Sequence, residues 1–197
     1  QVYADRPGWL AYAYADAIPS HRSRRLFERA QSLADAAVRI ASDTYSEPHV
    51  IASIVYCNAA GLAVQRGRVE AAGGLVERTL QMDRALDRKH IHAVSCLIHD
   101  AEVHALSGRY REGLASLAGA EAMLDELAIT DDSGWRARLC EIHAWMAVRN
   151  ARPQEAAGAL DDCAHREEDN LRWKLLRAEQ AYHAGDLEAA GELLAPW

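Results

Sequence analysis

The sequence predicts an all-α fold, a solenoid of antiparallel helix hairpins. Three observations support it: the composition, a phrase repeated four times, and the lack of strand patterns. Of the 197 residues, 50% are hydrophobic, and only five are proline. Alanine, leucine, glutamate and arginine, which favour helices, recur throughout. Alternation of apolar and polar residues nowhere exceeds about five residues, so no strand is expected.

Four short phrases each follow one helix-like run and open another, at residues 67–72, 108–113, 151–156 and 185–190. An alanine stands seven residues before each phrase, and a small and a large apolar residue stand five and nine residues after its start. Helices joined by a tight turn approach closely only where side chains are small, and a large residue one turn further on fills the groove. These positions are Ala60, Ala101, Ala144 and Ala178, then Ala72, Gly113, Ala156 and Ala190, then Val76, Leu117, Leu160 and Leu194.

This pattern resembles the tetratricopeptide repeat (TPR), which has a small residue in its first helix, glycine at the turn and a bulky residue two positions later. The bulky positions here are Val69, Tyr110, Pro153 and Leu187. The resemblance implies a right-handed superhelix of about ten helices in one domain, residues 1–197. The repeats are expected at 4–45, 47–88, 89–130, 133–168 and 170–197, the first being degenerate with its turn at Ile18.

The repeat spacing differs from the family standard. The phrases begin 41, 43 and 34 residues apart, whereas the standard repeat has about 34 residues. Periods near forty are similar to the effector domains of MalT-type, large ATP-binding LuxR-family transcription activators. This narrower resemblance implies the sensor part of a bacterial regulator. The chain begins with Gln1 and ends with Trp197 at an apolar position, so we expect a fragment of a longer protein.

Start and stop signals predict the helix bounds. Pro7 is expected to begin the first helix, a break at residues 18–20 to end it, and Ser20 to cap the second. Ser46 is expected to cap the third helix, with Pro48 just inside it, and Asn170 to cap the ninth. The second to tenth helices are expected at 20–41, 47–66, 69–86, 89–107, 110–128, 133 or 134 to 149, 153–166, 171–184 and 187–194.

Charge argues against nucleic-acid and membrane partners. The net charge is −7 and the pI is about 5.7, so no cationic field exists to neutralise phosphates. The basic cluster His21–Arg25 is interpreted as the solvated start of a helix. Residues 48–65 contain no Asp, Glu, Lys or Arg, and the repeat register favours a buried solenoid helix over a membrane span there.

The four cysteines, Cys57, Cys96, Cys140 and Cys163, are far apart and form no CxxC pair. This spacing argues against a zinc ribbon or a redox motif. Each cysteine falls in an apolar helical stretch, where a free thiol packs like a small hydrophobe. A reducing cytoplasm is the expected compartment.

Catalytic signals are weak, and no enzyme activity, metal or cofactor is expected. His92, His99 and His104 are seven and five residues apart, which is not the i, i+4 spacing of helical zinc sites. His99 followed by Asp100 resembles the signature of HD-type phosphohydrolases, so an HD-like metal-dependent hydrolase remains an alternative. Cys140 and His143 lie three residues apart on one helix and are better explained by core packing.

The TPR resemblance implies a concave face lined by the first helix of each repeat, which is available for recognition. Trp145 would serve as an anchor, or would pack on the next repeat. Arg138, Arg149 and Arg172 would bind a carboxylate or phosphate. Alternatively, they would pair with Glu141 and Glu179. We therefore expect a non-catalytic module for a protein, peptide or small effector; the alternative is a stand-alone scaffold. Self-association through the repeat ends is also expected. The candidate residues are Ser95, Glu102, Arg138, Glu141, Trp145, Arg149, Arg172, Glu179 and Tyr182.

Overall fold

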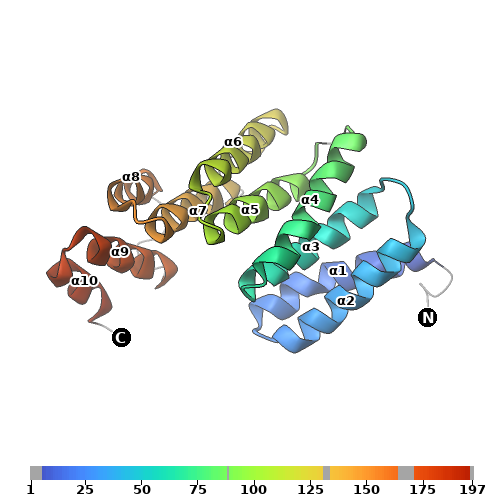
Figure 1. Cartoon of the computed structure of the whole chain (residues 1–197), viewed down its shortest axis with the longest axis horizontal. Helices are drawn as coiled ribbons and strands as arrows, with labels where there is room; N and C mark the ends of the chain where they lie inside the picture. The colour runs from blue at the N-terminus through green and yellow to red at the C-terminus, as the bar shows by residue number, and fades with distance from the viewer. Residues whose placement is uncertain (1–5, 88, 131–133, 164–170, 196–197) are drawn as a thin grey trace. The chain divides into compact units, whose positions relative to one another are not determined.

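The computed structural model describes residues 6–87, 89–130, 134–163 and 171–195. These residues form ten helices and no strand (Figure 1). The all-α expectation is therefore confirmed. In chain order the helices are α1 (Pro7–Ser23), α2 (Phe27–Thr44), α3 (Val50–Gln65), α4 (Val69–Ala85), α5 (Ile91–Leu106), α6 (Tyr110–Glu126), α7 (Trp135–Arg149), α8 (Pro153–Cys163), α9 (Leu171–Ala184) and α10 (Leu187–Leu194).

The chain divides into two compact units, residues 1–103 and 104–197. The first unit holds α1 to α4 and most of α5. Within it, α1 packs on α2, both pack on α3, and α3 packs on α4. Every residue of α3 from Ala52 to Val64 is buried except Asn58. The uncharged segment 48–65 is therefore mainly a core helix, as expected. No helix of the described chain is both long and apolar enough to cross a membrane.

The second unit holds the end of α5 and α6 to α10. Here α6 packs on α7, α7 on α8, α9 on both α7 and α8, and α10 on α9. An apolar cluster joins three of these helices. It consists of Ala144 from α7, Ala159 and Leu160 from α8, and Trp173 and Leu176 from α9. Successive hairpins thus share one core, as stacked repeats do.

The recurrent alanines lie inside the fold. Ala60, Ala101 and Ala144 are fully buried and Ala178 is 4% exposed, as the close packing predicted at these alanines requires. Small residues at these points let the helices approach closely. One position of the pattern differs: Leu194 is 44% exposed, and no helix of the described residues follows α10 to cover it.

Each hairpin turn places one residue in the left-handed conformation. The residues are Arg25, Gly67, Gly108, Ala151 and Gly185, with φ between 53° and 86°. Four are the first residues of the repeated phrases. At every turn the following residue donates its N–H to a carbonyl five positions back, for example Arg68 to Ala63 at 2.9 Å. This bond closes the end of the preceding helix.

The turn expected at Ile18 is wrong, because α1 continues through Pro19 to Ser23 and the first turn residue is Arg25. Ile18 is buried inside α1. Proline has no N–H, so it leaves the carbonyl of Ala15, four residues earlier, without its helical bond. The side-chain amide of Asn58 on α3 donates to that carbonyl at 3.0 Å. A partner 43 residues away in the sequence thus allows the helix to tolerate proline.

The expected start of α3 is also wrong. Ser46 and Pro48 lie outside the helix, and His49 is the cap. The His49 ring accepts the N–H of Ile51 through Nδ1 at 3.1 Å and stacks on Tyr45 with 4.0 Å between ring centroids. His49 has the extended backbone typical of a capping residue (φ −144°). The expected cap Asn170 and the last expected turn of α8 lie outside the described residues.

Candidate partner-binding surface

Four candidate residues form one stripe along α7. Arg138, Glu141, Trp145 and Arg149 follow one another at intervals of three and four residues, which places them on one helix face. Arg138 Nη1 lies 2.8 Å from Glu141 Oε2, so this pair forms the expected lattice of charges. The guanidinium carbon of Arg149 lies 5.8 Å from the centre of the Trp145 ring. The stripe thus carries an ion pair and a cation–aromatic pair.

Trp145 is half-buried and packs against the cluster of Ala144, Leu160 and Trp173. Arg149 beside it is exposed. Both interpretations of Trp145 therefore describe part of its environment: one part of the ring rests on the core and another reaches the surface. An aromatic ring fixed by packing can serve as a contact point at low entropic cost.

The α9 helix offers an exposed stripe of its own. Glu179 is exposed and Tyr182 is 62% exposed. Leu175, four residues before Glu179, is 47% exposed and was not predicted. Leu175 and Glu179 stand 34 residues after Glu141 and Trp145, which is the spacing of the two turns, so they occupy the equivalent face of the next repeat. The side chain of Arg172 lies outside the described residues.

The two candidates on α5 differ from the others in exposure. Ser95 is half-buried, and Glu102 is only 7% exposed. Glu102 Oε2 lies 2.8 Å from Nδ1 of His99. A β-carbon on Gly61 of α3 would stand 2.4 Å from His99 Nε2 and 2.7 Å from Arg22 Nη1, so glycine at this position gives these side chains their space. The burial of Glu102 removes it from the surface proposed below.

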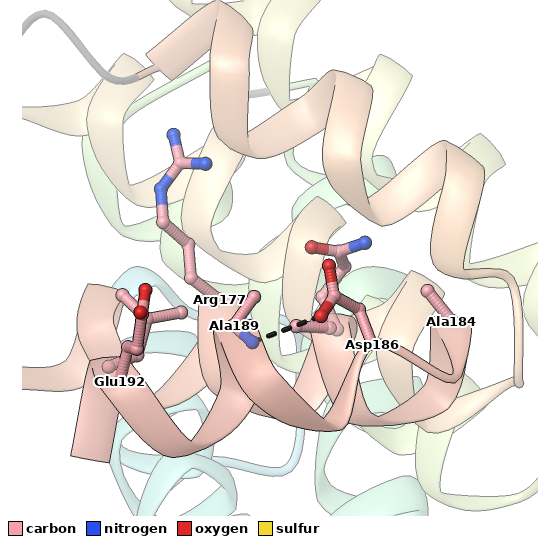
Figure 2. A pocket seen from close by; sticks show the side chains of 8 residues that line it. Arg177, Ala184, Asp186, Ala189 and Glu192 are labelled. Carbon is pink, nitrogen blue, oxygen red and sulfur yellow. Dashed lines mark hydrogen bonds between the residues drawn. The ribbon is translucent and has the colours of Figure 1, made fainter. Parts of the chain in front are cut away.

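An open groove of about 520 Å³ runs between α9 and α10. Figure 2 shows its lining, with Asp186 at the start of α10 accepting the N–H of Ala189 at 3.0 Å. Alanines form much of the wall, and Arg177 and Glu192 contribute charge. Arg177 also binds Asp161 of α8, with Nη2 to Oδ1 at 3.2 Å. This groove was not predicted, because local sequence does not show which helix faces lack a neighbour.

A polar network lies beneath the start of α5. Ser53 Oγ donates to Asp83 Oδ1 at 2.5 Å, and His90 Nε2 lies 3.4 Å from the same oxygen. The His90 ring also accepts the N–H of Ala93 through Nδ1 at 3.3 Å, so it holds the first turn of α5. Burial and the neighbouring His90 lower the pKa of His92. These contacts tie α3, α4 and the start of α5 together.

The described residues give little support for a metal site or a reactive thiol. There, no group of three or more His, Cys, Asp or Glu is arranged to hold a metal ion. Cys57 and Cys96 are free and buried, as expected. The expectation of a free thiol is wrong for Cys140, which is disulfide-bonded. Disulfide pairing depends on tertiary packing, and spacing alone did not indicate it.

A second charged cluster joins α6 to α8. The hydroxyl of Tyr110 donates to Glu155 Oε2 at 2.8 Å, and Arg152 Nη1 lies 2.7 Å from Glu155 Oε1. Arg152 also lies over the Tyr110 ring, 4.5 Å from its centre. Arg152 and then Tyr110 lower the pKa of Glu155, while burial and the bond to Glu155 raise the pKa of Tyr110. The cluster links the turns of successive hairpins.

Comparisons with known proteins support the fold. Two crystal structures of nearly identical TPR-like repeats, from a protein of Podosopora anserina described as a kinesin light chain, superpose with a TM-score of 0.68. They share 18% and 17% identity with this chain, and each match covers 96% of this chain and 93% of the other. The fold is that of a TPR-like helical repeat. No family model and no curated protein sequence matches the chain.

The TPR resemblance predicted candidate residues on α7 and α9 from the positions that line the concave face of that family. Exposed Leu175 and Leu187 were missed as surface residues. The signal that could have found Leu175 is its spacing of four from Glu179 and seven from Tyr182 on the same helix face.

Proposed function

We propose that the chain is a non-catalytic module that binds a protein or peptide partner through exposed side chains of α7 and α9. The observation that carries the proposal is the pairing of Trp145 with Arg149 at the surface of the second unit. Tryptophan and arginine dominate the binding energy of protein interfaces. The equivalent face of α9 extends this surface with Leu175 and Glu179.

The fold supports a scaffold role. TPR-like repeats leave one helix face of each repeat free of core packing, so side chains there are available to a partner. The structural neighbours described as kinesin light chain repeats favour a protein-interaction scaffold. At under 20% identity the partner of that protein does not transfer to this chain. Specificity is carried by the few exposed side chains named above.

A narrower candidate role is the sensor domain of a MalT-type transcription regulator, binding a small effector or a protein. The repeat spacings of 41 and 43 residues favour it. A Walker A loop upstream or a helix-turn-helix downstream in the full-length gene would support this role. A gene that encodes only repeats would favour the scaffold.

The test uses a peptide selected from a displayed library against the 197-residue chain. Trp145→Ala and Arg149→Ala are each expected to weaken its binding by about tenfold or more. The matched control is Trp9→Ala, because Trp9 is also a surface tryptophan but lies on α1. The variants should retain the wild-type circular dichroism spectrum. The assignment to α7 fails if both α7 variants bind as tightly as the parent.

A further inference from the structure

Exposed apolar side chains gather on the first and the last hairpin. Among the described residues, the large hydrophobic side chains with high exposure all belong to α1–α2 or α9–α10. The exposed residues are Trp9 and Leu26 on the first hairpin, and Leu175, Tyr182, Leu187 and Leu194 on the last.

Two contacts between successive hairpins inside the chain can be described by counting from the left-handed turn residues. Glu28, three residues after turn residue Arg25, pairs with Arg66, one residue before turn residue Gly67; the Oε1–Nη2 distance is 3.0 Å. The earlier hairpin thus supplies an acid from its second helix. The later hairpin supplies an arginine from the end of its first helix.

A second contact, further along the chain, joins two other positions near the turns. Tyr110, two residues after turn residue Gly108, lies beneath Arg152, one residue after turn residue Ala151. The earlier hairpin therefore offers position +2 and the later hairpin covers it with position +1. Each of the two contacts thus joins residues that lie within three positions of a turn residue.

On the last hairpin, the residues at positions +3 and +2 after the turn are both exposed among the described residues. Position +3 after Gly185 is Glu188, which is exposed, and position +2 is Leu187, which is 66% exposed. The first hairpin carries the matching groups. Its position −1 is Arg24, which is exposed, and its position +1 is Leu26, which is 45% exposed. The exposed groups on the two hairpins are therefore an acid and an arginine, and two leucines.

The charges around the two turns are also complementary. Exposed Arg24, Arg25 and Arg29 surround the turn of the first hairpin. The last hairpin carries exposed acids instead: Glu179, Asp186, Glu188 and Glu192. Surfaces of opposite charge attract during encounter and fix the orientation of docking. The groove of Figure 2, between α9 and α10, lies on this acidic hairpin.

We propose that the α9–α10 hairpin of one copy docks the α1–α2 hairpin of a second copy. Leu26 then packs on Leu187 and Arg24 pairs with Glu188, at the turn positions that the two contacts described above join within the chain. Two different faces meet in such a contact, so each copy can bind a second copy through its first hairpin and a third copy through its last hairpin. Association therefore grows with concentration and continues beyond a dimer unless the geometry closes a ring.

Sedimentation velocity of the 197-residue chain over a range of concentrations tests this contact. The weight-average sedimentation coefficient should rise with concentration and fall back with added salt, since surface ion pairs are screened. Leu187→Ala or Leu26→Ala should raise the dissociation constant by about tenfold, because each removes apolar area from the contact. Arg24→Glu or Glu188→Arg should raise it by about three- to tenfold.

The charge-swap variant, which combines Arg24→Glu with Glu188→Arg, should recover most of the wild-type association. Equal parts of the two single variants should associate with each other more tightly than either does alone. Leu175→Ala and Glu70→Arg are the controls: the first removes an exposed leucine on another face of α9, and the second reverses the +3 acid of an inner hairpin. Both should associate like the parent.

Two results would overturn the proposal. One is a parent chain that stays monomeric at every concentration. The other is association that Leu187→Ala and the single charge reversals leave unchanged, or that the swap fails to recover. All substituted side chains are exposed, so circular dichroism should show an intact fold in each variant.

Discussion

The hairpins α7–α8 and α9–α10 follow the same sequence pattern but differ in what covers them. Val148 and Leu160 are 1% and 0% exposed, whereas Tyr182 and Leu194, 34 residues later, are 62% and 44% exposed. The apolar cluster shows the cause: Leu160 packs against Trp173 and Leu176 of α9. A repeat position is therefore buried by its neighbour and not by its own sequence. Substitutions can separate the stability that a neighbouring hairpin contributes from the stability that local conformation contributes.

Truncating the same register position in the two hairpins should have the most unequal effect. Leu160→Ala removes a fully buried side chain and should lower the free energy of unfolding by about 2–5 kcal/mol. Leu194→Ala should change it by no more than about 0.5 kcal/mol. Urea unfolding at low protein concentration measures both. Equal losses would contradict the claim that the next hairpin decides burial.

A hydrogen-bond donor from another helix should also stabilise the fold where a proline interrupts the bonding of α1. Asn58→Leu removes the donor to the Ala15 carbonyl and should cost about 1–3 kcal/mol, because that carbonyl is left without a hydrogen bond. Pro19→Ala restores a backbone N–H that can bond the same carbonyl.

A double-mutant cycle in urea is the measurement. The loss caused by Asn58→Leu should shrink in the Pro19→Ala background. If the two changes add independently, Asn58 does not compensate for the proline.

The turn residue Ala151 affects the free energy of unfolding through its own backbone conformation. Its φ is 53°, a conformation that costs alanine about 1 kcal/mol more than glycine. Ala151→Gly should therefore stabilise the fold by about 0.5–1 kcal/mol. Ala115→Gly, at an exposed position inside α6, should destabilise it by about 1 kcal/mol and serves as the control. A loss of stability in Ala151→Gly would show that the turn is not strained.

The smallest expected effect is on the pH dependence of unfolding. Arg152 and Tyr110 hold the pKa of Glu155 below its usual 4.5 in the folded chain. A lowered folded pKa gives stability that is complete above the unfolded pKa and is lost as the pH falls through the folded pKa. The parent should therefore lose more stability than Glu155→Gln on acidification across this range. Parallel pH profiles from urea unfolding would contradict the contact.

Local chemistry explains how much of the fold the sequence could predict. The turn residues Gly67, Gly108 and Gly185 and the alanines seven positions before them were readable, because glycine favours a left-handed turn and small residues mark close packing. The bounds of α10 and the start of α4 followed directly. The helix break predicted at Pro19 was wrong, because the side chain that bonds the free Ala15 carbonyl, Asn58, lies on another helix.

The binding surface was less predictable, for the same reason. Counting from the turns placed Trp145 and Arg149 on one face of α7. It could not show that Glu102 is buried beside His99, or that Leu187 is exposed. Exposure depends on which element lies opposite, and that information is not contained in any single repeat.

Hydrogen exchange of the whole chain, read by mass spectrometry, tests the central claim most directly, at concentrations where the chain is monomeric. Backbone amides exchange slowly where a helix is covered on several sides and fast where it is open. Amides of α3, enclosed by α1, α2 and α4, should exchange slowest, and amides of α10 should exchange fastest among the helices. Protection of α10 equal to that of α3 would contradict the claim that coverage by the next hairpin decides burial.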